Sequence, residues 1–222
     1  MIRAVIFDMF ETLITHYRCP VYFGAQMAED AGIPAEKFHA LWQETEDDRS
    51  LGRVMFEEVV ERILRENRCY SEKTWRNIVQ KRIMTKRECF RHLHPEILPL
   101  FVTLKEKGLL IGLISNCFSE EAAVIRESVL FPYFDAVFLS CEQGVQKPDN
   151  EIFKRCMGKL AVEAGECVYV GDGGSRELET AKSLGMTAVQ AAWYLQDGTM
   201  QPVGRKTDFP QMENPLEVLD YV

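Results

Sequence analysis

Carboxyl, hydroxyl and ammonium groups follow short apolar runs at four places in this chain of 222 residues. They are Asp8, Ser115 with Asn116, Lys147, and Asp172 with Glu177. Short apolar runs are typical of buried strands, and the strands of an open α/β sheet present their carboxyl ends to one ligand-binding crevice. A hydroxyl can donate to an anionic oxygen, and Mg²⁺ prefers carboxylate oxygens. The four places therefore indicate one crevice lined by carboxyl, hydroxyl and ammonium groups.

The elements that must position these groups alternate along most of the chain. Five apolar runs read as strands, at residues 4–7, 109–114, 136–139, 167–170 and 187–189. Four segments between them read as helices, at residues 95–107, 120–127, 151–160 and 178–184. Runs that are apolar throughout indicate strands buried on both faces, as in parallel sheets. The pattern predicts an α/β fold with a doubly wound parallel sheet.

Residues 16–88 depart from this alternation. Four amphipathic helices are expected there, at residues 25–31, 35–45, 55–66 and 72–87, with no strand between them. We therefore expect an α/β core made of residues 1–15 and 89–222, with residues 16–88 inserted after the first strand. This insert is called the cap below.

Composition narrows the classes of partner. The net charge is −8 and no basic stripe is present, so a nucleic acid is not expected to bind. No apolar run approaches the roughly 20 residues that span a bilayer, and because residues 4–7 read as a strand, a targeting segment is not expected. The seven cysteines include no CxxC pair and suit reduced thiols in a cytoplasmic protein. The sequence leaves the oligomeric state open.

Taken in order, the four places resemble the motifs of the haloacid dehalogenase (HAD) superfamily. The first motif of that family is usually Asp-x-Asp-x-Thr, and residues 8–12 here read Asp-Met-Phe-Glu-Thr. Lys147 stands before a proline, as the lysine of the family does, and residues 171–177 resemble its Gly-Asp magnesium motif. The position of the cap resembles the helical-cap (subclass I) branch. The resemblance covers essentially the whole chain and implies a Rossmann-like HAD core.

The resemblance also implies a role for each motif. Asp8 would be the nucleophile, Ser115 would bind a phosphoryl oxygen, and Lys147 would neutralise charge on nucleophile and substrate. Mg²⁺ would be held by Asp8, the backbone carbonyl of Phe10, Asp172 and Glu177. Further contacts to an anionic small-molecule substrate are expected from Met9, Phe10, Thr12, Asn116 and, on the cap, Arg49 and Arg53.

One residue departs from the family pattern. Phe10 stands where the phosphatases carry their second Asp, the general acid and base. The 2-haloacid dehalogenases also have an aromatic residue there, but they use no metal and lack the Gly-Asp pair. Three carboxylates in one pocket are costly unless a cation joins them, so the acidic cluster favours the metal-dependent branch. Glu11, the neighbour of Phe10, is expected to point away from the site.

The expected function is therefore Mg²⁺-dependent hydrolysis of a small phosphorylated molecule through an aspartyl-phosphate. Three alternatives remain open at this point. One is metal-free 2-haloacid dehalogenation by Asp8. Another is phosphonate cleavage, which in this superfamily needs a Schiff-base lysine in the cap that the sequence does not single out. The last is a weakly catalytic or non-catalytic family member.

Overall fold

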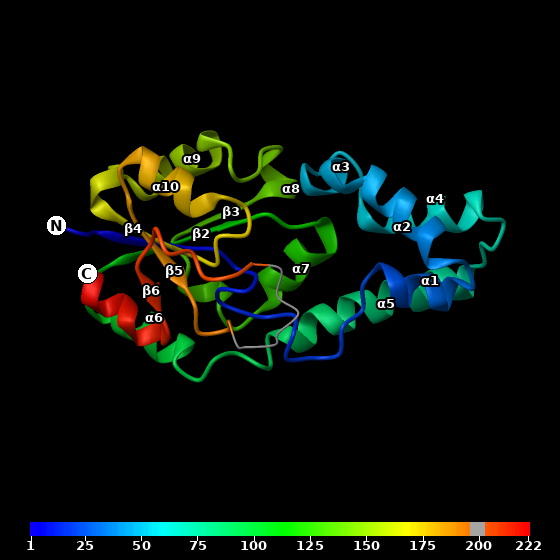
Figure 1. Ribbon diagram of the computed structural model, residues 1–222, viewed down its shortest axis with the longest axis horizontal. Coiled ribbons are helices and arrows are strands. Elements are labelled where there is room, and N and C mark those ends of the chain that lie inside the picture. Colours follow the sequence, from blue (N-terminus) through cyan, green and yellow to red (C-terminus); the bar gives the residue numbers. More distant parts are fainter. Residues whose placement is uncertain (196–202) are drawn as a thin grey trace.

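Six parallel strands form one sheet in the order β3-β2-β1-β4-β5-β6 (Figure 1). The computed structural model describes residues 1–195 and 203–222. The strands are β1 (Ala4–Phe7), β2 (Leu110–Ser115), β3 (Ala136–Leu139), β4 (Cys167–Gly171), β5 (Thr187–Ala191) and β6 (Gln211–Met212). Strands β2 and β4 flank β1 on its two sides, so the ends of these three strands lie next to one another.

Helices cover both faces of the sheet. On one face lie α6 (Ile97–Glu106), α7 (Ser119–Glu127) and the 3₁₀ helix η3 (Pro215–Tyr221), and on the other lie α9 (Asn150–Leu160) and α10 (Glu177–Leu184). Shorter pieces are α8 (Ser140–Gln143), η1 (Phe131–Tyr133) and η2 (Ala164–Glu166). Alternate residues of β1 enter the two apolar clusters, because successive strand side chains point to opposite faces.

The cap is helical and packs around an apolar cluster of its own. Its helices are α1 (Gly24–Ala31), α2 (Ala35–Glu44), α3 (Glu46–Ser50), α4 (Phe56–Glu66) and α5 (Glu72–Cys89). Side chains such as Phe38, Phe56 and Ile63 are fully buried in this cluster. Figure 1 shows the cap helices beyond the sheet, joined to it through the segment after β1 and through the end of α5.

The prediction of a doubly wound parallel sheet with a helical insertion after the first strand is confirmed. Several short elements were not predicted, namely β6, α3, α8, η1, η2 and η3. Strand β6 has only two residues, too few for a pattern, and α3 has five, in a segment that ends near Gly52. The division into core (1–15 and 89–222) and cap (16–88) stays a prediction, and residues 196–202 of that core range lie outside the described residues.

Among the described residues, no helix has both the length and the apolar character needed to cross a membrane.

Candidate active site

The order of the strands brings three of the expected residues together. Asp8 directly follows β1, Ser115 is the last residue of β2, and Asp172 directly follows β4. The backbone N–H of Asp8 donates to the carbonyl of Val170 at 2.9 Å, which ties the end of β1 to β4. Because β1 lies between β2 and β4, the polar ends of the three strands share one edge of the sheet.

Asp8, Asp172 and Glu177 form a compact acidic cluster at this edge. One carboxylate oxygen from each lies within 4.8 Å of the other two, and all three residues are buried. Glu177 is the first residue of α10, and its two oxygens accept from the backbone N–H groups of Gly173 at 2.6 Å and Ser175 at 2.7 Å. Gly173 has a φ of 92°, which a residue with a Cβ rarely adopts.

The electrostatics of the cluster favour a bound cation. Burial raises the pKa of Asp8 to about 6, although the neighbouring Lys147 opposes this rise. Burial, with the charges of Asp8 and Glu177, raises the pKa of Asp172 to about 8. Nearby like charges disfavour ionisation, and a divalent cation would remove that cost. The donors are all carboxylate oxygens, which suits a hard cation such as Mg²⁺.

Lys147 lies against the nucleophile candidate. Its Nζ is 2.6 Å from Oδ1 of Asp8, and its side chain is buried. Burial acts to lower the pKa of Lys147, but the charges of Asp8 and Glu177 and the hydrogen bond to Asp8 raise it above its ordinary value. The side-chain amide of Asn116 donates to the Lys147 carbonyl at 2.9 Å and accepts from the Lys147 N–H at 2.8 Å. Asn116 therefore fixes the backbone that carries the lysine.

The loop after Asp8 is tight and largely buried. The carbonyl of Met9 accepts from the N–H groups of Leu13 and Ile14 at 2.9 and 3.1 Å, and the carbonyl of Thr12 accepts from the indole of Trp193 at 2.8 Å. The Thr12 hydroxyl is buried and has no hydrogen-bond partner among the described residues. Ser115 is fully buried at the end of β2. These contacts fix the backbone of the loop that follows the nucleophile candidate.

Phe10 and Glu11 both turn toward His16. The Phe10 ring stacks on the His16 ring with centroids 4.8 Å apart. Glu11 has a φ of 57°, unusual for a residue with a side chain, and its carboxylate accepts from Thr15 Oγ1 at 2.5 Å and the His16 N–H at 3.0 Å. Burial acts to raise the pKa of Glu11, but these hydrogen bonds hold it below its ordinary value.

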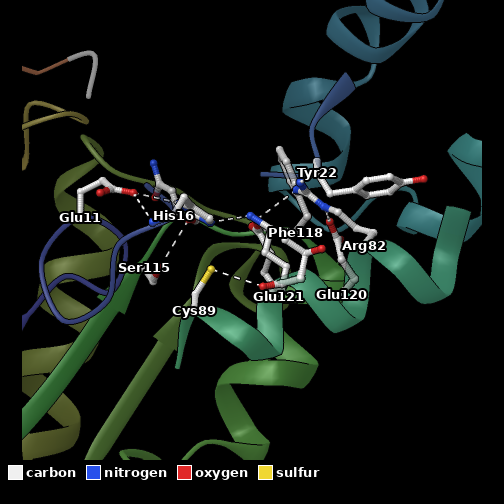
Figure 2. Close-up of polar contacts among 12 residues, drawn as sticks. Glu11, His16, Tyr22, Arg82, Cys89, Ser115, Phe118, Glu120 and Glu121 are labelled. Carbon is white, nitrogen blue, oxygen red and sulfur yellow. Dashed lines mark hydrogen bonds and ion pairs between the residues drawn. The ribbon is translucent and has the colours of Figure 1, made fainter. Parts of the chain in front are cut away.

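A buried chain of charged groups continues from His16 into the cap, as Figure 2 shows. Nε2 of His16 lies 2.5 Å from Nζ of Lys86, and the same Nζ lies 2.6 Å from Glu121. Arg82, one turn before Lys86 on α5, contacts Glu121 at 3.2 Å and Glu120 at 3.1 Å. This chain joins the loop after Asp8, helix α5 of the cap and the start of α7 in the core. From residue types alone, its members read only as charged residues on helices.

Two adjoining cavities open at the site. The inner one, of about 350 Å³, is lined by Asp8, Phe10, Glu11, Asn116, Lys147 and Asp172 among others. The outer one, of about 450 Å³, shares Asn116 and Lys147 with it and extends between Glu46, Asp47 and Ser50 of the cap and Phe118, Glu121 and Arg176 of the core. A substrate whose reacting group lies at Asp8 would thus place its remainder between core and cap.

The two cap arginines expected at the substrate line neither of these cavities. Arg49 is buried between aromatic rings, with its guanidinium carbon 3.4 Å from the Trp42 centroid and 4.1 Å from the Phe118 centroid. Arg53 is exposed and pairs with Asp48 at 3.0 Å. Arg49 and Arg53 are four residues apart, and this spacing gives no information about which side of the segment meets the core.

Comparison with known proteins places these motifs in a family. A family model described as "Hydrolase: haloacid dehalogenase-like hydrolase" matches residues 2–185. The chain is 34% identical over 99 residues to a glyceraldehyde 3-phosphate phosphatase of Methanocaldococcus jannaschii, a match that covers 44% of this chain and 43% of that protein. The chain therefore aligns with less than half the length of that curated relative.

Two solved structures resemble nearly the whole chain. A 2-haloacid dehalogenase from Pseudomonas syringae pv. Tomato has a TM-score of 0.67 at 20% identity, over 99% of this chain and 97% of that one. A HAD family enzyme from Bacteroides thetaiotaomicron, in complex with magnesium and inorganic phosphate, has a TM-score of 0.67 at 17% identity, over 89% and 98% of the two chains. At these identities the likeness shows the fold alone.

Proposed function

This chain belongs to the haloacid dehalogenase-like hydrolases, and we propose that it is a Mg²⁺-dependent phosphatase of a small phosphorylated molecule. The observation that carries the proposal is the buried cluster of Asp8, Asp172 and Glu177 with Lys147 only 2.6 Å from Asp8. A single lysine cannot balance three buried carboxylates, so the cluster fits a divalent cation. The glyceraldehyde 3-phosphate phosphatase among the relatives and the magnesium and phosphate in a solved relative support this choice.

In this proposal Asp8, Asp172, Glu177 and the carbonyl of Phe10 would hold the Mg²⁺ ion. When bound, the ion would polarise a phosphoryl oxygen and offset its repulsion from the carboxylates. The binding of the metal by the Phe10 carbonyl remains a prediction, and so do the catalytic roles of the other residues.

The chain's own groups then act in two displacements. A carboxylate oxygen of Asp8 attacks phosphorus as the bond to the leaving-group oxygen breaks, which gives an aspartyl-phosphate. The Lys147 ammonium, the Ser115 hydroxyl and the loop N–H groups near Met9 and Phe10 stabilise the charge on the phosphoryl oxygens. Water then attacks the same phosphorus and releases phosphate and free Asp8. Because Asp8 has a pKa of about 6 before metal binds, it is available as a carboxylate at neutral pH.

Phe10 decides which substrates react quickly. General acid catalysis contributes about 10²–10⁴-fold to such reactions, and a phenyl ring cannot donate a proton to the leaving group. Glu11 lines the inner cavity, but its carboxylate is committed to Thr15 and His16. We therefore expect aryl and acyl phosphates, whose leaving groups need no proton, to be hydrolysed much faster than sugar phosphates.

The test measures p-nitrophenol release from p-nitrophenyl phosphate with Mg²⁺ and with EDTA. The proteins are the wild type, Asp8→Asn and the matched control Asp208→Asn, which makes the same chemical change at an exposed position. The proposal requires Mg²⁺-dependent turnover that Asp8→Asn abolishes and Asp208→Asn retains. Turnover that survives in Asp8→Asn would contradict it. Halide release from 2-haloacids in EDTA would instead assign the metal-free dehalogenase chemistry that the aromatic residue at position 10 suggests.

A further inference from the structure

Two cysteines face each other where the cap joins the core. Cys19 lies in the connection from the first strand to the cap, and Cys89 is the last residue of α5, where the chain returns to the core. Their Sγ atoms are 3.0 Å apart although the residues are 70 positions apart in the sequence. A disulfide has an S–S length of about 2.05 Å, so the two sulfurs need to approach by only about 1 Å.

The two thiols differ in accessibility. Cys19 is partly exposed, whereas Cys89 is completely buried. Burial, together with the contact from Cys19, raises the pKa of the Cys89 thiol above its ordinary value. Thiolate character and exposure decide which cysteine an oxidant attacks first. Cys19 is therefore suited to react first, with Cys89 waiting beside it as the resolving thiol.

The other cysteines provide a comparison within the same protein. All seven are free thiols. Cys117 and Cys141 form the other thiol contact, at 3.9 Å, and both lie in the core. Cys69, partly exposed on the cap, donates its thiol hydrogen to the Leu64 carbonyl at 3.5 Å. Of these two thiol contacts, the Cys19–Cys89 pair is thus the closer, and it is the one that connects the two ends of the cap.

We propose that Cys19 and Cys89 are a redox modification site, oxidised by a hydroperoxide to a reversible disulfide that restrains the cap. The Cys19 thiolate takes one oxygen from the hydroperoxide and becomes a sulfenic acid. The rest of the hydroperoxide leaves as an alcohol or water. The Cys89 sulfur then attacks the Cys19 sulfur, the S–O bond breaks, and water leaves. Two thiols have lost two electrons to the hydroperoxide, and a dithiol reductant reverses the change.

The position of this bond explains the effect we expect. It would close residues 19–89 into a ring that contains all five cap helices. It would also link the segment that enters the cap to the segment that leaves it. The link would lie three residues after Lys86, which contacts His16 near the entry to the cap and Glu121 in the core. The outer cavity lies between cap and core, so movement of the cap about these connecting segments would change access to it. Fixing them should slow turnover.

The first experiment maps the thiols of the full chain after hydrogen peroxide treatment. Free thiols are blocked with N-ethylmaleimide, the protein is digested, and peptides are weighed with and without dithiothreitol. We expect a Cys19–Cys89 peptide pair that has lost two hydrogen atoms and separates on reduction, absent in Cys19→Ser and retained in Cys69→Ser. Oxidation of Cys19 without a link to Cys89, or a link from Cys19 to another cysteine, would overturn the proposal. So would an unreacted Cys19 under conditions that link Cys117 to Cys141.

The second experiment measures the effect on the cap and alone rests on the proposed function. Oxidised wild type should show a several-fold lower kcat for p-nitrophenyl phosphate, restored by dithiothreitol, while Cys19→Ser is insensitive to the peroxide. A mapped disulfide with unchanged kcat would refute the restraint. Should the untreated protein show no phosphatase activity, the proposed function fails, and the thiol mapping still decides whether the site exists.

Discussion

Replacing Asp172 with Asn should stabilise the metal-free protein while it weakens the metal site. The folded state holds Asp172 at a pKa of about 8, against an ordinary value of 3.8. Each unit of pKa is worth about 1.36 kcal/mol. At pH 7 the unfolded chain ionises this carboxyl freely and the folded chain does not, which costs the folded state on the order of 4 kcal/mol. Asn avoids that cost, and its amide oxygen can still accept from the Gly174 N–H as Asp172 does at 3.0 Å.

The sign of the pH dependence follows from the same values. Between pH 4 and 8 the folded state binds more protons at Asp172 than the unfolded state, so the penalty grows as the pH rises through this range. We expect Asp172→Asn to raise the free energy of unfolding by about 2–4 kcal/mol at pH 7 and by only about 1–2 kcal/mol at pH 5.

Urea denaturation in EDTA at the two pH values, followed by circular dichroism, measures both numbers. Repeating it with millimolar Mg²⁺ should stabilise the wild type, because a ligand that binds only the folded state adds stability, and should stabilise the variant less. Asp208→Asn, on the surface, should leave the unfolding free energy nearly unchanged. A destabilised Asp172→Asn in EDTA, or an equal response of both proteins to Mg²⁺, would refute the account of the acidic cluster.

Other parts of the site lead to further expectations. Lys147→Met should cost at least about 10²-fold in kcat, and the acid limb of a pH–rate profile should move to higher pH than in the wild type, because Lys147 lowers the pKa of Asp8. Phe10→Asp should raise the turnover of an alkyl phosphate by about tenfold or more in a phosphate-release assay, since it restores a proton donor; no gain would count against the leaving-group argument. Arg82→Met removes the ion-pair partner of the buried Glu120 and leaves the buried Glu121 with Lys86 alone, and it should cost about 3–5 kcal/mol in urea denaturation. The exposed pair of Arg76 on the same helix gives the matched control, and Arg76→Met should cost less than about 1 kcal/mol.

The sequence was sufficient to predict the sheet and the residues at its edge. Asp8 and Asp172 each follow an apolar run, and parallel strands bring such positions to one edge. Their distance from Glu177 depends on two backbone N–H contacts in the loop before α10, which no pattern of residue types encodes. The strand pattern was informative because the central strands β1 and β4 are buried at every position, and so on both faces.

The cap was harder to predict because its important contacts are tertiary. Arg49 reads as one more charged residue on a helix, yet it is buried between Trp42 and Phe118, which are far apart in the chain. Lys86 and Glu121 lie 35 positions apart and meet only because α5 returns to the start of α7. Charge patterning within one helix cannot indicate such a pair.

The buried chain from Glu11 through His16 and Lys86 to Glu121 limits how far this protein can be treated as modular. Its members come from the loop after Asp8, the cap and the core. A cap transplanted from another family member would leave Glu121 buried without a cation unless it carried equivalents of Lys86 and Arg82. Exchange of specificity between relatives by swapping caps would therefore require the receiving core to change at the start of α7 as well. At this junction cap and core must change together.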